Sequence, residues 1–127
     1  MARVEITQNK GPEVIDSWSG QTSSTDADNY GDIVNVRLYT LHSYQVIFSA
    51  GGSNVTFEVL GSNYFDTSEP KKPSLDFEND WTVIHSESIK AGDNIAYCDV
   101  WNFKYACIRF TGGASGSDIK VFEKHNV

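Results

Sequence analysis

The residues best suited to chemistry in this sequence are the three aspartates of the segment DADNYGD, Asp26, Asp28 and Asp32. Carboxylate oxygens are the ligands that calcium prefers, and the spacing from Asp26 follows the start of an EF-hand loop, with Gly31 at the glycine position. Arg37 stands where the bidentate acid should be, and no flanking helices are expected. The segment supplies too few ligands, so we favour a solvated polar loop, with calcium binding as the alternative.

Two cysteines, Cys98 and Cys107, are too few for a disulfide framework or a four-ligand zinc site. If Asn102-Phe103 forms a two-residue turn, Cys98 lies directly opposite Cys107. Facing residues place their Cβ atoms about 4.5–5.5 Å apart, which is slightly long for a disulfide. We therefore expect two packed, reduced thiols, with a disulfide as the alternative.

No pattern of residues indicates catalysis or a cofactor. His42, His85 and His125 are scattered and lack metal-ligand spacing. No serine stands in a G-x-S-x-G elbow, and neither cysteine has a histidine near it in sequence to act as a base. The sequence predicts a protein that is not an enzyme, with no metal site and no cofactor.

Aromatic residues are the more suggestive binding candidates. Rings that stand among polar neighbours suit sugar stacking or a protein interface, whereas packing in the core or beneath a loop is the alternative. The candidates are Trp18, Tyr30, Tyr64, Phe65, Phe77, Trp101 and Phe103.

The composition limits the classes of partner. The chain has 127 residues and a formal net charge of −7, so its surface repels phosphate backbones and we expect no nucleic-acid partner. No apolar run is long enough to span a membrane. The N-terminal sequence lacks the hydrophobic core of a signal peptide, so synthesis and folding in a cytosol are expected.

Apolar and polar residues alternate along most of the chain, as in half-buried strands. Val55, Phe57 and Val59 share one face of their strand, and Ala106, Ile108 and Phe110 share one face of another. About eight to nine short strands at this spacing predict one all-β domain over residues 1–127, an antiparallel β-sandwich or jelly roll without substantial helix. The expected strands are Arg3–Thr7, Glu13–Trp18, Asp32–Thr40, Ser43–Ala50, Asn54–Gly61, Trp81–His85, Ile95–Val100, Lys104–Thr111 and Asp118–Glu123.

Short connections suggest which strands pair. Gly51-Gly52-Ser53-Asn54 predicts an antiparallel hairpin between Ser43–Ala50 and Asn54–Gly61, because glycine reaches positive φ without steric cost. A second hairpin is expected between Ile95–Val100 and Lys104–Thr111.

The segment Ser17–Asp32 is too polar for a core strand and is expected to form a loop or an N-terminal arm within residues 1–32. In this interpretation Trp18 and Tyr30 anchor the arm on a neighbouring subunit, and the sandwich folds without it. The alternative is that Trp18 fills one end of the core.

Three motifs in residues 54–111, VTFEVLGSN, DW-x-VI and KYACIRF, occur in a familiar order. The chain resembles small β-sandwich accessory proteins of tailed bacteriophage particles and, more loosely, galactose-binding-like (discoidin-type) jelly rolls. Arg109 matches the arginine of the last of these strands, and Cys107 departs from the usual pattern.

This resemblance implies a non-enzymatic virion structural protein, made in the host cytoplasm and acting by protein–protein binding. It would be a head decoration (cement) protein or a small tail or fibre component, and a homo-oligomer, for example a trimer, with capsid or tail proteins as partners. The alternative is a carbohydrate-binding module, lectin-like or receptor-binding, that recognises a host-surface glycan through Tyr64, Phe65, Phe77 or Trp101.

Overall fold

The computed structural model of the chain describes residues 14–23, 29–63, 80–112 and 116–127. Within these ranges it contains eight β-strands and no α-helix. In chain order they are β1 (Val14–Gln21), β2 (Val34–Asn35), β3 (Leu41–Ala50), β4 (Val55–Ser62), β5 (Thr82–Ile89), β6 (Asn94–Val100), β7 (Tyr105–Thr111) and β8 (Asp118–Asn126). The expected first strand, Arg3–Thr7, lies outside the described residues.

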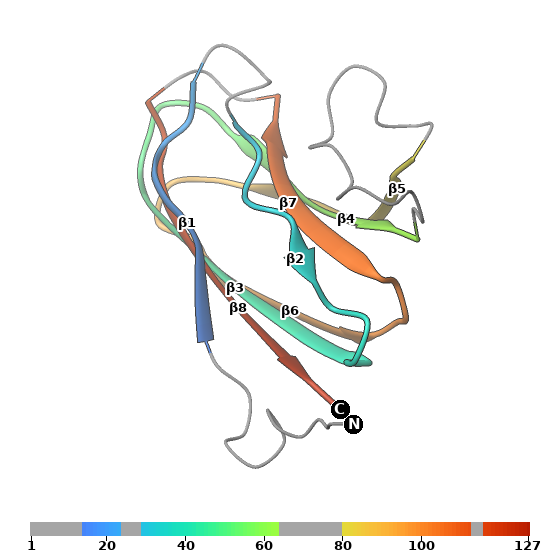
Figure 1. Cartoon of the computed structure of the whole chain (residues 1–127). Helices are drawn as coiled ribbons and strands as arrows, with labels where there is room; N and C mark the ends of the chain where they lie inside the picture. The colour runs from blue at the N-terminus through green and yellow to red at the C-terminus, as the bar shows by residue number, and fades with distance from the viewer. Residues whose placement is uncertain (1–13, 24–28, 64–79, 113–115) are drawn as a thin grey trace.

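The strands form two antiparallel sheets that pack face to face (Figure 1). The first sheet has the order β1-β8-β3-β6 and the second has the order β2-β7-β4-β5. This is the strand order of an eight-stranded jelly roll, in which the chain crosses repeatedly from one sheet to the other. The predicted all-β sandwich is therefore confirmed.

The predicted hairpin between Ser43–Ala50 and Asn54–Gly61 is wrong, because β3 and β4 lie in different sheets. β3 pairs with β6 and β8, whereas β4 pairs with β5 and β7. The glycine-rich connection carries the chain across the sandwich instead of reversing it within one sheet. Phe48 and Phe57 consequently both face the core from opposite layers.

The predicted pairing of Ile95–Val100 with Lys104–Thr111 is wrong for the same reason, since β6 and β7 lie in different sheets. Cys98 pairs with Ser43 in the first sheet and is exposed, whereas Cys107 is buried in the second sheet. Both are free thiols, and they do not face each other.

The long strand expected over Asp32–Thr40 is reduced to the two residues of β2. Directly after it, the Val36 N–H donates to the Lys104 carbonyl at 2.9 Å, and the Tyr39 N–H donates to the Val36 carbonyl at 3.0 Å. The second bond closes a tight turn that sends the chain to β3 in the other sheet.

The core lies between the sheets and is built from alternate residues of the longer strands, as the sequence predicts. The shared faces expected in β4 and β7 are present, and β3 and β8 contribute in the same way. The buried core residues include Tyr44, Val46, Phe48, Val55, Phe57, Val59, Ile108, Phe110, Ile119 and Val121.

Trp18 belongs to this core and not to an arm. A register shift between Asp16 and Trp18 in the pairing of β1 with β8 marks a bulge, and the Trp18 ring packs edge-on against Phe110 with centroids 5.3 Å apart. The strand predicted over Glu13–Trp18 is present as β1, but it continues to Gln21, so the expectation that the polar segment lies outside the strands is wrong for residues 19–21. The structure agrees with the alternative, in which Trp18 packs against the core.

Residues 29–33 run beside β7 at the edge of the second sheet, where Tyr30 forms an isolated β-bridge with Arg109. The side chains of Tyr30 and Trp81 are buried on the outer face of this sheet in a separate apolar cluster with Leu60 and Cys107. The Gly31 N–H donates to the Ile108 carbonyl at 2.9 Å, and a Cβ at Gly31 would lie only 2.7 Å from the Ile108 side chain. Glycine therefore permits the close approach of this segment to β7.

Candidate functional site

A chain of hydrogen-bonded polar side chains lies inside the sandwich, between β3 and β8. His42 and His125 form a cross-strand pair with Nδ1 atoms 2.8 Å apart. His42 Nε2 lies 3.0 Å from the Trp101 carbonyl oxygen, and His125 Nε2 lies 2.6 Å from Glu123 Oε2. His42 is 0% exposed and His125 is 4% exposed, so this network is closed to solvent.

The hydrogen-bond partners assign the protons of this network. A carbonyl oxygen can only accept, so His42 Nε2 carries a hydrogen and donates to Trp101. Burial lowers the pKa of His42 from 6.5 to about 4; the bond to Trp101 opposes this effect and the neighbouring His125 adds to it. Neutral His42 therefore accepts at Nδ1 from His125, and one further proton lies between His125 and Glu123.

Aromatic stacking extends the network toward the β6 edge of the first sheet. The Trp101 and His42 rings stack with centroids 3.5 Å apart, and Trp101 Nε1 donates to the Tyr97 hydroxyl at 3.2 Å. Tyr97 in turn stacks on His85 of the second sheet with centroids 3.9 Å apart. Burial raises the pKa of Tyr97. The stack of Tyr97 on His85 joins the two sheets, so these contacts stabilise the sandwich.

A second polar cluster lies on the outer face of the second sheet. Arg109 Nε donates to Glu58 Oε1 at 2.7 Å, and its Nη1 donates to the Tyr30 hydroxyl at 3.4 Å. Burial opposes the charge of Arg109, but its bonds to Tyr30 and Glu58 outweigh this effect and raise its pKa. The ion pair thus fastens the segment that contains Tyr30 onto β4 and β7.

Neither polar cluster is open to a substrate, because their central groups are buried and bonded to one another. In the part of the chain that the structure describes, no three His, Cys, Asp or Glu side chains are grouped to hold a metal ion. The hydrogen bonds and the ion pair of these clusters hold strands of the fold together.

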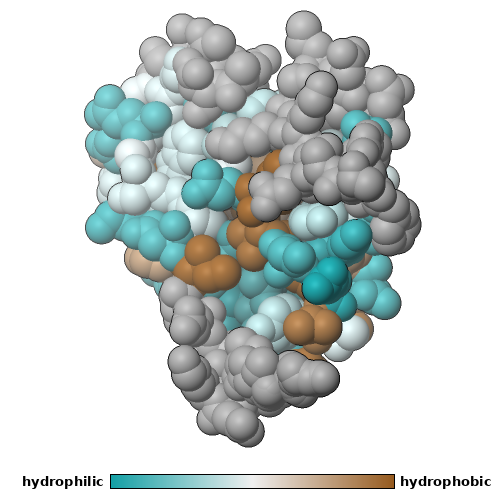
Figure 2. All heavy atoms as spheres, viewed as in Figure 1, coloured by the Kyte–Doolittle hydropathy of each residue, from teal (hydrophilic) through white to brown (hydrophobic). Residues whose placement is uncertain are grey.

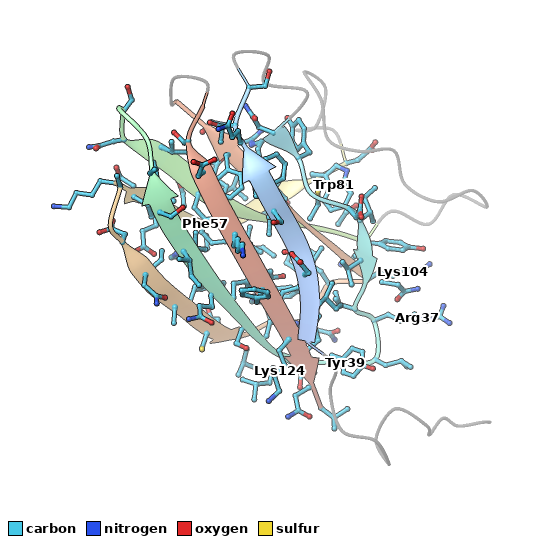
Figure 3. The ribbon with its side chains drawn as sticks, turned by 90° about the vertical axis from the view of Figure 1, so that its left-hand side faces the viewer. Arg37, Tyr39, Phe57, Trp81, Lys104 and Lys124 are labelled. Carbon is cyan, nitrogen blue, oxygen red and sulfur yellow. The ribbon has the colours of Figure 1, made fainter. Side chains whose placement is uncertain are left out.

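The first sheet has an open hollow on its outer face, across β8, β3 and β6, with a volume of about 320 Å³. We call it the sheet-face hollow. Cross-strand pairs set its arrangement: Phe122 pairs with Gln45, and Gln45 pairs with Ala96. Figure 3 views this face, with Lys124 labelled near the lower end of β8. The residues that line the hollow are Ser43, Tyr44, Gln45, Asn94, Ala96, Cys98, Phe122, Glu123 and Lys124.

Four exposed apolar residues lie at one end of the sandwich, where β3 begins and β6 and β8 end. Leu41 pairs with Val100, Val127 follows β8, and Leu38 precedes β3. Their side chains are 42%, 69%, 64% and 56% exposed, respectively. We call these four residues the end patch. Figure 2 shows hydrophobic side chains at the lower right, where the connection from β2 to β3 lies in Figure 1.

Among the predicted binding residues that the structure describes, Trp101 and Phe103 are brought together, whereas Trp18 and Tyr30 lie elsewhere. Trp18 and Tyr30 pack within the chain, Trp101 stacks on His42, and half-buried Phe103 contacts Trp101 edge-on with centroids 6.0 Å apart. Asp32 is exposed. The candidates Asp26, Asp28, Tyr64, Phe65 and Phe77 lie outside the described residues.

Sequence reasoning missed both the buried histidine pair and the sheet-face hollow. The histidine pair had a usable signal, because His42 has the same strand parity as Val46 and Phe48, and His125 has the same parity as Ile119 and Val121. No signal in the sequence pointed to the sheet-face hollow, because the hollow is formed by strands whose pairing the sequence did not predict.

These features define a small acidic jelly-roll domain with an internally bonded polar network, an open sheet face and an apolar end. No protein-family model matches the chain, and no curated protein matches it. The described residues include no helix that could cross a membrane.

Proposed function

We propose that this protein is a non-enzymatic structural component of a bacteriophage virion, a head decoration protein or a small tail or fibre component. It acts by binding other virion subunits, as a homo-oligomer such as a trimer. The observation that carries the proposal is the end patch, because apolar side chains gathered on the surface of a small domain are typical of protein interfaces.

Two further features support this proposal. Eight-stranded jelly rolls form many viral capsid domains, so the fold supports the proposal by analogy. The central groups of the two polar clusters are bonded to one another within the fold, and this favours binding through the surface.

We expect the double substitution Leu41→Ser, Val100→Ser to weaken attachment to the virion or self-assembly at least about tenfold. Burying an aliphatic side chain contributes about 1.5–3 kcal/mol, and 1.4 kcal/mol corresponds to a tenfold change in affinity. Both side chains are exposed in the monomer, so the melting temperature should change little. Attachment is measured by co-sedimentation with particles, and assembly by analytical ultracentrifugation.

Val83→Ser is the matched control, because Val83 is 39% exposed on β5, outside the end patch. It should attach like the unmodified protein. Purified particles of the phage that encodes the protein should contain it at a fixed copy number. Its absence from those particles would refute the virion proposal, and unchanged binding by the double variant would refute the role of the end patch.

A second candidate function, carbohydrate binding, is favoured by the sheet-face hollow. It combines one aromatic ring, Phe122, with the amides of Gln45 and Asn94 on an open surface. Small-ligand sites commonly join apolar walls to a few polar groups that fix orientation. A phage receptor-binding component would unite both candidate functions, with the glycan on the host surface.

A further inference from the structure

We infer that the sheet-face hollow binds an acidic saccharide, a sugar ring that carries a carboxylate. This inference rests on the carbohydrate-binding candidate and specifies its site and the charge of its ligand. The hollow and the end patch share no residue, but they adjoin: Leu41 and Val100 lie on the same face of β3 and β6 as Ser43 and Cys98, two residues away.

The shape of the hollow suits a flat ring of modest size. Ser43, Ala96 and Cys98 have small side chains, and they lie beside the larger Phe122 and Gln45. The volume of about 320 Å³ is at the lower end of the range of about 300–1,000 Å³ for small-ligand pockets. Phe122 is half-buried, so part of its ring is available for stacking against the C–H face of a sugar.

Two amides supply directional hydrogen bonds beside the ring. Gln45 Nε2 donates to Asn94 Oδ1 at 3.1 Å, which orients both side chains. This arrangement leaves the Gln45 carbonyl oxygen as an acceptor and the Asn94 amide hydrogens as donors. An adjacent acceptor and donor match neighbouring hydroxyl groups of a sugar, each of which can donate and accept.

The exposed charge beside the hollow indicates an anionic ligand. Lys124 lines the hollow, and Lys120 lies on the same face of β8, on the other side of Phe122. Neither lysine forms an ion pair with a residue that the structure describes. Asp16, which pairs with Phe122 from β1, and Asp118, which begins β8, are acids on the same face and balance the two lysines over the face as a whole. Among the residues that line the hollow, however, the exposed charged residue is Lys124, since Glu123 is buried.

The positive charge sits where a ligand stacked on Phe122 can reach it. Lys124 and Phe122 are two residues apart on β8 and therefore point to the same side of the sheet. The ammonium group of lysine is a compact charge that pairs well with a carboxylate. A sugar ring on Phe122 with its carboxylate toward Lys124 would satisfy the ring, the amides and the charge together.

The test is a calorimetric titration of the full chain with three oligosaccharides of the same length. They are a hexuronic acid oligomer, the neutral hexose oligomer and a sulfated hexose oligomer. We expect the hexuronic acid oligomer to bind at least about tenfold more tightly than the neutral oligomer. Lys124→Gln should remove most of that preference and leave neutral-sugar binding unchanged. Lys90→Gln is the matched control, because Lys90 is exposed in the connection between β5 and β6.

Phe122→Leu should weaken binding of both oligomers at least about fivefold, since it keeps apolar bulk but removes the ring; thermal melting verifies that the variant folds. Three results would overturn the inference but leave carbohydrate binding intact. They are equal binding of the neutral and acidic oligomers, unchanged binding by Lys124→Gln, and a preference for the sulfated oligomer. Binding of none of the three would overturn the inference and count against the carbohydrate candidate, whereas the virion proposal would stand or fall on the end-patch variants alone.

Discussion

Replacing Arg109 with alanine will lower the free energy of unfolding by about 3–5 kcal/mol, the range for removing one partner of a buried ion pair. The side chains of Arg109 and Glu58 are only 10% and 11% exposed. Without the guanidinium, Glu58 is left as a buried carboxylate with no counter-charge, and Tyr30 loses a hydrogen-bond partner. Urea unfolding followed by tryptophan fluorescence measures the change.

Arg37→Ala is the matched control, because Arg37 is exposed, and it should change the free energy of unfolding by less than about 0.5 kcal/mol. The double variant Glu58→Leu, Arg109→Met removes both charges and should recover most of the loss, since well-packed apolar residues often replace a buried ion pair at little cost. A loss below about 1 kcal/mol for Arg109→Ala would show that the pair behaves like an exposed salt bridge.

Acidification from pH 6.5 to pH 4 will lower the free energy of unfolding by about 3 kcal/mol through His42. Its pKa is about 4 in the folded protein and 6.5 in the absence of burial. Between these values the unfolded chain binds more protons than the folded one, so stability increases with pH in this window. The contribution is fully present above pH 6.5 and is lost as the pH falls toward 4. A gap of about 2.5 pH units, at about 1.36 kcal/mol each, sets the size.

His42→Gln separates this effect from the titration of other acids. The variant cannot titrate, and its amide can still donate to the Trp101 carbonyl in place of Nε2. It should be less stable at pH 7 but lose much less stability between pH 6.5 and 4 than the unmodified protein. Unfolding curves at half-unit pH intervals provide the comparison. Parallel pH profiles for the two proteins would rule out His42 as the source.

Much of the candidate site could not be read from the sequence. The inward position of His42 follows from its strand parity. Its hydrogen bond to His125, which is 83 residues away in sequence, requires β3 and β8 to be neighbours. The proximity of Gln45 to Asn94 requires β3 to pair with β6. Alternation assigns each side chain to a face but does not say which strand lies beside it.

The sequence by itself determined the fold class and the composition of the core. The alternation of Val55, Phe57 and Val59 requires one buried and one outward face, and enough such segments occur to close two layers around one core. This property is local, because neighbouring side chains of a strand point to opposite faces whatever the strand pairs with.

Only the tertiary structure decided how the strands pair and which outward faces become buried. The short connection between β3 and β4 is compatible with a hairpin and with a crossing between sheets, and alternation is the same in both. Cys107 and Arg109 point away from the core, as expected, yet the side chains of Tyr30, Ile33 and Trp81 pack on that face. Partners distant in sequence meet only when both layers close, so pairing and coverage depend on the packing of the whole chain.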